Sequence, residues 1–207
     1  KHSKEHVPLF NGQETVPTSL RKAIQAFALA CTARELRGQG SEHSSMLVHV
    51  TRLVHVQKHV TAQVESALRK LKQGVLRGTE PSLILELQEL WETDFAPTSQ
   101  AVSAMSSDTD GPIISIAWKE IADKLPDVLE DISVRMINGS AKDALDYAEV
   151  TSHGLKVIAV GGDKLSRGLT LEGLCISYFV RTTKMYDTLM QMGRWFGYRP
   201  GYLDLCR

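Results

Sequence analysis

Short apolar segments alternate with longer amphipathic segments along this chain. Continuous apolar runs that include residues 47–50, 157–160 and 175–179 are typical of parallel strands buried on both faces. Residues 134–137 belong to a stretch that alternates apolar and polar side chains, which also indicates a strand. Strands separated by helical segments predict an α/β fold with an open parallel sheet flanked by helices, in which these four strands are adjacent.

The N-terminal part, residues 1–43, is expected to be a linker followed by one helix. Residues 1–17 are polar and show no hydrophobic period, which is typical of a linker. Either Thr18 or Ser19 can cap the helix that follows, and Gly38 can end it.

Helical periodicity recurs after the first predicted strand. A helix is expected over residues 53–73 with Gly74 at its end. Its apolar face comprises Val56, Val60, Val64, Leu68 and Leu71. Further helices are expected at residues 81–95, 115–129 and 186–195. Residues 96–111 are rich in Ser, Thr, Asp and Ala, so they are expected to form a loop.

The composition is that of a globular protein with a real core. The chain has 207 residues, of which 43% are hydrophobic, enough for one large domain or one domain with an insertion. It contains no apolar run long enough to span a bilayer and no signal-peptide pattern. Its cysteines, Cys31, Cys175 and Cys206, show no paired spacing, which favours reduced thiols and a cytoplasmic location.

Charge is segregated along the chain although the net charge is zero. Residues 1–78 carry a net charge of +7, residues 79–155 carry −11 and residues 156–207 carry +4. A polyanion would therefore favour the two ends of the chain and avoid the middle. The alternative is that these charges only solvate exposed helix faces.

The most informative stretch begins at Gly161 and ends near residue 202. There, a glycine-rich turn that contains Asp163, Arg167 and Gly168 separates two apolar runs. Glycines without side chains allow another backbone to approach closely and expose N–H groups to it. The alternative is a simple tight turn, fixed by an ion pair between Asp163 and Arg167.

Two arginines follow the second apolar run. Arg194 ends the predicted helix at residues 186–195, and Arg199 lies just beyond it. A guanidinium group stays protonated and donates in a planar fork, which suits it to the charge that spreads over a phosphoryl group during transfer. The alternative is that both arginines lie on the surface at a helix end.

This order of elements resembles motifs V and VI in the C-terminal RecA-like domain of superfamily-two helicases. The sequence MQMGRWFGYR at residues 190–199 also resembles the signature of the Z-one domain family, a bacterial family whose proposed activity is endonuclease. Its members resemble helicases and are encoded near restriction and defence genes. The resemblance covers about residues 44–207, within which residues 61–111 are larger than the core needs and are expected to form a helical insertion.

The resemblance implies a function and a set of site residues. The expected function is the C-terminal RecA-like half of a nucleic-acid-dependent ATPase in a bacterial restriction or defence system. Its partners would be an N-terminal RecA-like domain and nucleic acid, with DNA favoured over RNA. It would use ATP and Mg²⁺ only together with that domain. The arginine finger would be Arg194, with Arg199 as the second arginine. The implied nucleotide contacts are Asp163, Arg167, Gly168 and Thr170. The implied nucleic-acid contacts are Thr51, Arg52, Gly139, Ser140, Gly161 and Gly162.

The chain departs from the helicase pattern at three positions. Met190 stands where Gln or His is usual, Gly197 where a second arginine is usual, and Thr170 where Asp is frequent. Arg199 could replace the second arginine from a displaced position. The sequence has no phosphate-binding G-x-x-x-x-G-K-[ST] loop, so the chain by itself is expected not to hydrolyse ATP.

Two other functions stay open: an endonuclease domain, as the family description proposes, and an interaction module without catalytic activity. Pro126-Asp127 could begin a nuclease motif, but no later acidic residue has a lysine two positions on. The histidine pairs His2/His6 and His55/His59 have metal-ligand spacing on a helix, yet no third ligand is evident. No metal site is therefore expected.

Overall fold

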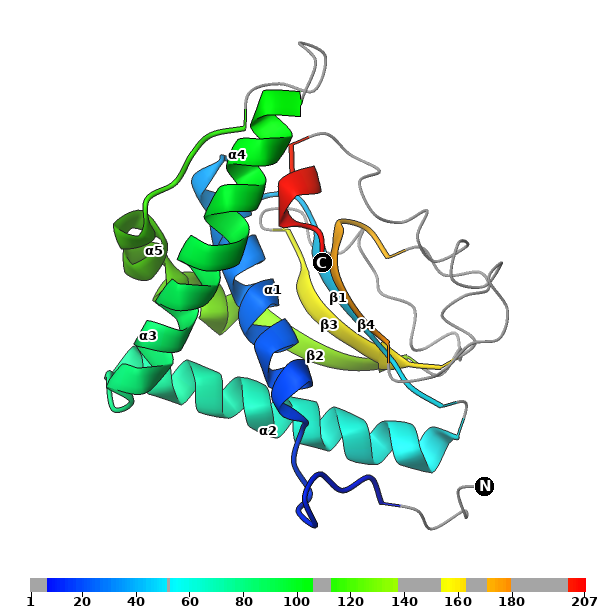
Figure 1. Cartoon of the computed structure of the whole chain (residues 1–207). Coiled ribbons are helices and arrows are strands. Elements are labelled where there is room, and N and C mark those ends of the chain that lie inside the picture. Colours follow the sequence, from blue (N-terminus) through cyan, green and yellow to red (C-terminus); the bar gives the residue numbers. More distant parts are fainter. Residues whose placement is uncertain (1–6, 52, 106–112, 138–153, 163–170, 180–200) are drawn as a thin grey trace.

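An open sheet of four parallel strands forms the centre of the fold. The computed structural model describes residues 7–51, 53–105, 113–137, 154–162, 171–179 and 201–207. The strands are β1 (Ser44–His49), β2 (Ile132–Ile137), β3 (Lys156–Gly161) and β4 (Leu174–Phe179). They lie in the order β2-β3-β1-β4 (Figure 1). The predicted α/β fold with an open parallel sheet is confirmed, and all four predicted strands are present.

The middle of the sheet is buried on both faces because its strands are apolar on both sides. All six residues of β1 and of β3 are buried. Met46 and Val48 of β1 belong to the main hydrophobic core, whereas Leu47 between them belongs to a second cluster. Successive side chains of a strand point to opposite faces, so the two clusters lie on opposite faces of the sheet. Burial of one such side chain stabilises the fold by about 1.5–3 kcal/mol.

Most described helices lie on one side of the sheet. Figure 1 shows α1, α3, α4 and α5 on one side, with α2 running beneath them. The helical elements are α1 (Thr18–Leu36), α2 (Val54–Arg77), α3 (Pro81–Leu90), the π-helical turn η1 (Trp91–Phe95), α4 (Ala96–Met105), α5 (Trp118–Asp131) and the short 3-10 helix η3 (Leu203–Leu205). None of the described helices combines the length and the apolar character needed to cross a membrane. The helix expected at residues 186–195 lies outside the described residues.

Two predicted helix ends need correction. Helix α1 begins at Thr18 after Pro17 and has no side-chain cap, so neither Thr18 nor Ser19 caps it. Helix α2 does not end at Gly74 but continues to Arg77, and Gly78 in the left-handed conformation, with φ of 61°, ends it. Gly74 is instead a packing position, because a Cβ there would lie 2.5 Å from Leu83 Cδ2.

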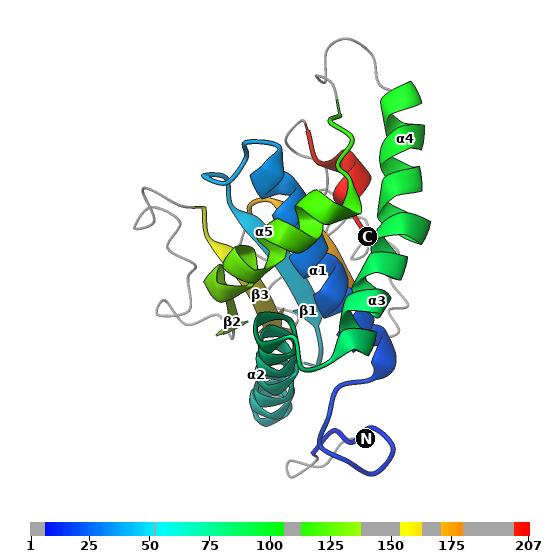
Figure 2. The same ribbon diagram turned by 90° about the vertical axis from the view of Figure 1, so that its left-hand side faces the viewer.

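The loop expected at residues 96–111 is wrong over its first ten residues, which form α4. Helices α3 and α4 join through η1 into one helical rod (Figure 2). Pro97 would normally break a helix because its ring meets the carbonyl four residues earlier. The wider π-helical turn ends at Phe95, two residues before Pro97, and its extra width relieves this conflict. Trp91 and Phe95 in this turn are buried in the main core.

Candidate nucleic-acid interface

Two predicted contact segments meet at the carboxyl edge of the sheet. The N–H of Val50, directly after β1, donates a hydrogen bond to the carbonyl of Gly161 at the end of β3, at 2.8 Å. One residue further on, Gly162 packs against Thr51, because a Cβ at Gly162 would lie only 2.6 Å from the Thr51 carbonyl oxygen. The order of the strands therefore brings Thr51, Gly161 and Gly162 together, although they are distant in the sequence.

Gln57, in the first turn of α2, joins the two segments. Its side chain is buried, with 3% of the residue exposed, and its Nε2 donates a hydrogen bond to the Thr51 carbonyl at 2.9 Å. The same nitrogen would lie 2.9 Å from a Cβ at Gly162. Sequence reasoning missed Gln57. The only signal was an uncharged polar residue directly beside Val56, on the apolar face of the helix.

A stacked pair of rings lies at the ends of β1 and β4. The rings of His49 and Phe179 have centroids 4.4 Å apart and are inclined by 6°. His49 is buried, and it is the last residue of β1 before the Val50–Gly161 hydrogen bond. The stack therefore supports the same edge of the sheet on the side of β4. Sequence reasoning missed this pair too, because only the strand order makes the two residues neighbours.

The other predicted site residues lie outside the described residues. These are Arg52, Gly139, Ser140, Asp163, Arg167, Gly168, Thr170, Arg194 and Arg199. Their assigned roles stay predictions. Within the described part of the chain, no group of three or more His, Cys, Asp or Glu side chains could hold a metal ion.

The buried cysteines Cys31 and Cys175 are unsuited to act as nucleophiles. Burial raises the pKa of the Cys175 thiol to about 11, and it raises the pKa of the Cys31 thiol even further above its ordinary value. Both thiols are therefore protonated near neutral pH, and a protonated thiol is a poor nucleophile.

The Z1 domain family matches residues 19–207, which is most of the chain. The chain belongs to the Z1 domain family. It is the Z-one family whose resemblance was noted in the sequence. No curated protein and no solved structure matches the chain significantly.

The last residues of the Z1 domain are anchored on the core directly after the predicted arginine segment. Arg37, directly after α1, forms a two-pronged ion pair with Asp204, with distances of 2.8 and 2.7 Å, and both side chains are buried. Ser99 of α4 also donates a hydrogen bond to Asp204. The guanidinium of Arg34 lies 4.5 Å above the centre of the Tyr202 ring. These contacts fix Tyr202 and Asp204, which follow Arg194 and Arg199 in the sequence.

Arg207 continues this anchor along the outer edge of β4. Its N–H donates to the carbonyl of Cys175, and its carbonyl accepts from the N–H of Ser177, both at 2.9 Å. Its side chain pairs with Asp94 at 3.0 Å and lies 4.4 Å above the ring of Phe95. Asp94 and Phe95, the two residues that contact the Arg207 side chain, lie in the π-helical turn η1. The helical rod therefore contributes to the seat of the C-terminal segment.

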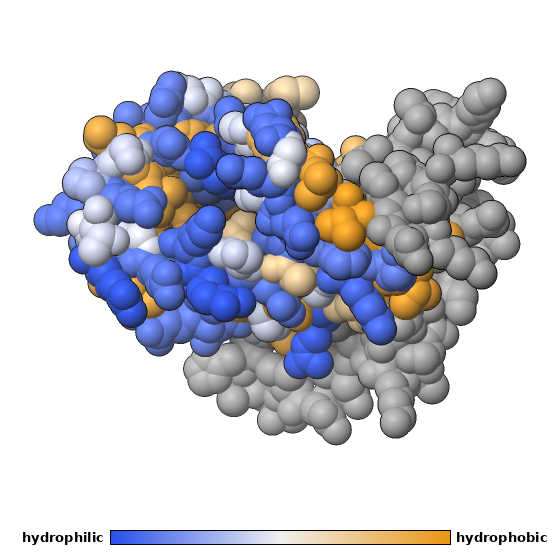
Figure 3. All heavy atoms as spheres, turned by 90° about the horizontal axis from the view of Figure 1, so that it is seen from below, coloured by the Kyte–Doolittle hydropathy of each residue, from blue (hydrophilic) through white to orange (hydrophobic). Residues whose placement is uncertain are grey.

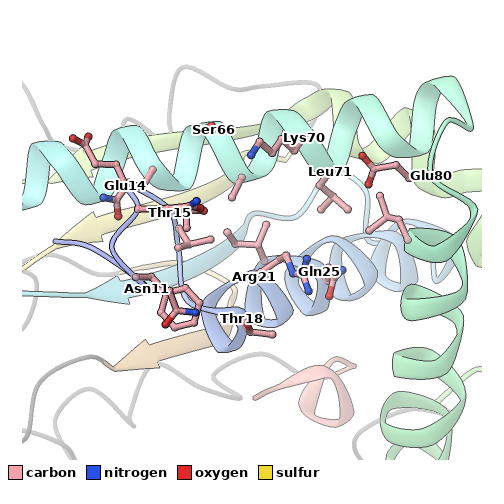
Figure 4. Close-up of a pocket in the computed structure, with 17 residues that line it drawn as sticks. Asn11, Glu14, Thr15, Thr18, Arg21, Gln25, Ser66, Lys70, Leu71 and Glu80 are labelled. Carbon is pink, nitrogen blue, oxygen red and sulfur yellow. The ribbon is translucent and has the colours of Figure 1, made fainter.

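A separate cavity of about 490 Å³ lies between the N-terminal arm (residues 7–17), α1 and α2 (Figure 4). Arg21 and Lys70 line it from α1 and α2, but Glu14 and Glu80 line it as well. These charges balance, so the cavity does not favour a polyanion. The arm also precedes residue 19, where the match to the Z1 domain begins.

Figure 3 shows that the side of the molecule on which α2 lies is mainly hydrophilic.

Replacement of Gly162 by alanine is expected to lower the free energy of unfolding by about 1–3 kcal/mol, the usual cost of overpacking. The added Cβ would meet the Thr51 carbonyl at 2.6 Å, and a backbone group cannot rotate away. Denaturant unfolding of the chain measures this loss.

Gly40→Ala is the matched control. A Cβ at Gly40 would lie equally close, at 2.6 Å, but to the carboxylate of Glu35, which is the flexible end of a side chain. The denaturant midpoint of the Gly40→Ala variant should therefore stay near that of the wild type. Equal midpoints for the two variants would mean that the Thr51 and Gly162 turns are not in rigid contact.

Proposed function

We propose that this chain is the C-terminal RecA-like half of a nucleic-acid-dependent ATPase, and that its carboxyl sheet edge contacts the nucleic-acid backbone. An N-terminal RecA-like domain would hold ATP and Mg²⁺, and Arg194 would reach the triphosphate across the interface between the domains. Thr51, Gly161 and Gly162 would contact the backbone of the nucleic acid. The setting in a bacterial restriction or defence system stays an expectation from the family resemblance.

One observation carries this proposal. The turn after β1 and the turn after β3 were assigned to one nucleic-acid site from the sequence, and they touch each other at Thr51 and Gly162. Ligands of open parallel α/β sheets bind outside the carboxyl ends of the strands, which is where this contact lies. Membership of the Z1 domain family and the parallel sheet support the same assignment.

The chemistry of the turns also suits a phosphodiester backbone. Gly161 and Gly162 add no side chain that would keep a ligand away from the main chain. Main-chain N–H groups and hydroxyl groups such as that of Thr51 are common donors to phosphate oxygens. Such contacts fix position without reading sequence, so the site is expected to bind DNA with little sequence preference.

The isolated chain is expected to show no ATPase activity and to bind single-stranded DNA weakly. Its sequence has no loop for the phosphates of ATP, and half of a two-domain site makes few contacts. Backbone contacts release counterions, so the logarithm of the binding constant should fall by about 0.7 per phosphate contact for each tenfold rise in salt. Fluorescence anisotropy across a salt series, together with a phosphate-release assay, measures both properties.

The same experiment, together with a gel assay for DNA cleavage and an ATPase assay of the full-length protein, separates the alternatives. ATP turnover by the isolated chain would show that the nucleotide site has been assigned to the wrong domain. Cleavage of the DNA that requires a divalent metal would favour the endonuclease. DNA-independent ATPase activity of the full-length protein, without binding by this chain, would favour an interaction module.

A further inference from the structure

We propose that Gln57 is a positioning residue that locks the Thr51 turn against the Gly162 turn, so that the two turns bind the nucleic-acid backbone as one surface. This inference rests on the proposed function. It assigns to the interface a residue on a third element, the helix α2, that neither the motif pattern nor the family match singles out.

The first argument is geometric. Three groups meet at one point: the Gln57 side-chain amide, the Thr51 carbonyl and the backbone of Gly162. The amide donates to the carbonyl at 2.9 Å, and only the absence of a Cβ at Gly162 leaves room for this bond. The N–H of Leu53 also points to the Thr51 hydroxyl, at 3.4 Å, so the turn is held from both sides.

The second argument comes from an unsatisfied atom. Oε1 of Gln57 is buried and has no hydrogen-bond partner among the residues that the structure describes. A buried acceptor without a partner costs about 1–3 kcal/mol. A methionine would fill the same space without this cost, so the amide at position 57 needs a reason beyond packing. The bond from Nε2 to the Thr51 carbonyl supplies that reason, because only a donor can hold the turn in this way.

Gln63 on the same helix provides a matched control. It is also buried, with 8% of the residue exposed, and its Nε2 also donates to a backbone carbonyl, that of Pro8 at 2.7 Å. Its partner belongs to the N-terminal arm instead of the sheet edge. Loss of the amide at Gln63 therefore costs a similar hydrogen bond but leaves the two turns untouched.

The lock itself can be tested on the chain by NMR, without reference to activity. In Gln57→Met, the amide resonances of Leu53 and Gly162 should shift. Hydrogen exchange of the Leu53 amide, which donates to the Thr51 hydroxyl, should accelerate by about tenfold, which corresponds to the loss of one hydrogen bond. In Gln63→Met, both amides should behave as in the wild type. Unchanged Leu53 and Gly162 amides in Gln57→Met would overturn the proposal.

A second variant tests whether the donor matters. In Gln57→Glu, the ionised carboxylate cannot donate to the Thr51 carbonyl, but the protonated carboxyl can, and burial raises the pKa of such a group. Affinity for a labelled oligodeoxythymidine should therefore be reduced by about tenfold near pH 8 and should recover near pH 5. Gln57→Met should stay weak at both pH values, because it has no proton to regain.

Each affinity is compared with that of the wild type and of Gln63→Glu at the same pH. This comparison removes the pH-dependent contribution of every other titratable group in the chain, because both variants share those groups. Equal losses in Gln57→Glu and Gln63→Glu, or no recovery at low pH, would overturn the positioning role. Shifted Leu53 and Gly162 amides in Gln57→Met, together with no oligonucleotide binding by the wild type, would leave the lock in place and refute the proposed function instead.

Discussion

Replacement of Arg194 by alanine in the full-length protein is expected to lower the rate of ATP hydrolysis by about a thousandfold or more. An arginine finger acts mainly on the charge that develops as the phosphoryl group transfers, so its loss lowers kcat far more than it weakens nucleotide binding. Steady-state ATPase rates in the presence of DNA, together with nucleotide affinities, measure the two effects separately.

Three further variants make this result specific. Arg194→Lys should not restore turnover, because an ammonium group does not reproduce the planar fork of a guanidinium. Arg199→Ala should give a similar defect if Arg199 replaces the second arginine of the pattern, and a mild one if it lies only on the surface. Arg69→Ala removes an exposed arginine of α2 and should leave the rate unchanged. Unchanged turnover in Arg194→Ala would refute the finger role and favour an interaction module.

The second large effect concerns stability. Arg37→Met is expected to lower the free energy of unfolding by about 3–5 kcal/mol, because it leaves the carboxylate of Asp204 buried without its cation. The side chains of Arg37 and Asp204 are only 5% and 0% exposed, and they are joined at 2.7 Å. Chemical denaturation of the chain, followed by circular dichroism, measures this loss.

An exposed ion pair between α1 and α3 provides the control. Arg21 and Glu86 are 4.0 Å apart, with side chains 56% and 46% exposed. Exposed pairs contribute about 0–1 kcal/mol, so Arg21→Met should change the stability by no more than that. If both variants lost equally little, Asp204 would have another way to be satisfied, and residues 201–207 would not depend on Arg37 for their anchor.

The anchor has a consequence for the proposed motor. In the sequence, Arg194 and Arg199 come after β4 and directly before residues 201–207, which Arg37, Arg34 and the turn η1 hold in place. A finger must be held in a defined position to act, since a displacement of about 1 Å can cost a hundredfold in rate. The rod of α3, η1 and α4, expected from the family resemblance to be an insertion on a helicase core, therefore holds residues 201–207, which directly follow the arginines in the sequence.

Local patterns in the sequence were sufficient for the elements of the fold. Apolar runs predicted β1, β3 and β4, and an alternating pattern predicted β2. The period of Val56, Val60 and Val64 predicted the buried face of α2, and Gly38 follows the end of α1 as expected. These signals are local because a strand buried on both faces, or a helix buried on one, must show its burial in its own residues. The parallel α/β class followed from their alternation.

Errors arose where a distant contact outweighed the local signal. Gly74 does not end its helix, because Leu83 of α3 packs against it and a helical glycine is the residue that fits there. The polar stretch after Phe95 is helical, because the π-helical turn accommodates Pro97 and buries Phe95. Neither the packing of Leu83 nor the burial of Phe95 is visible in a short window of sequence.

The sequence by itself determined the strands, most of the helices, the fold class and the family of this protein. Only the tertiary structure decided which of these elements are neighbours. The contact of Thr51 with Gly162, the bond from Gln57 to the Thr51 carbonyl and the pair of Arg37 with Asp204 all join residues that the order β2-β3-β1-β4 and its helices bring together. Strand order depends on the packing of the whole core. Hydrophobic periodicity does not predict this order, because the period shows only whether each position is buried.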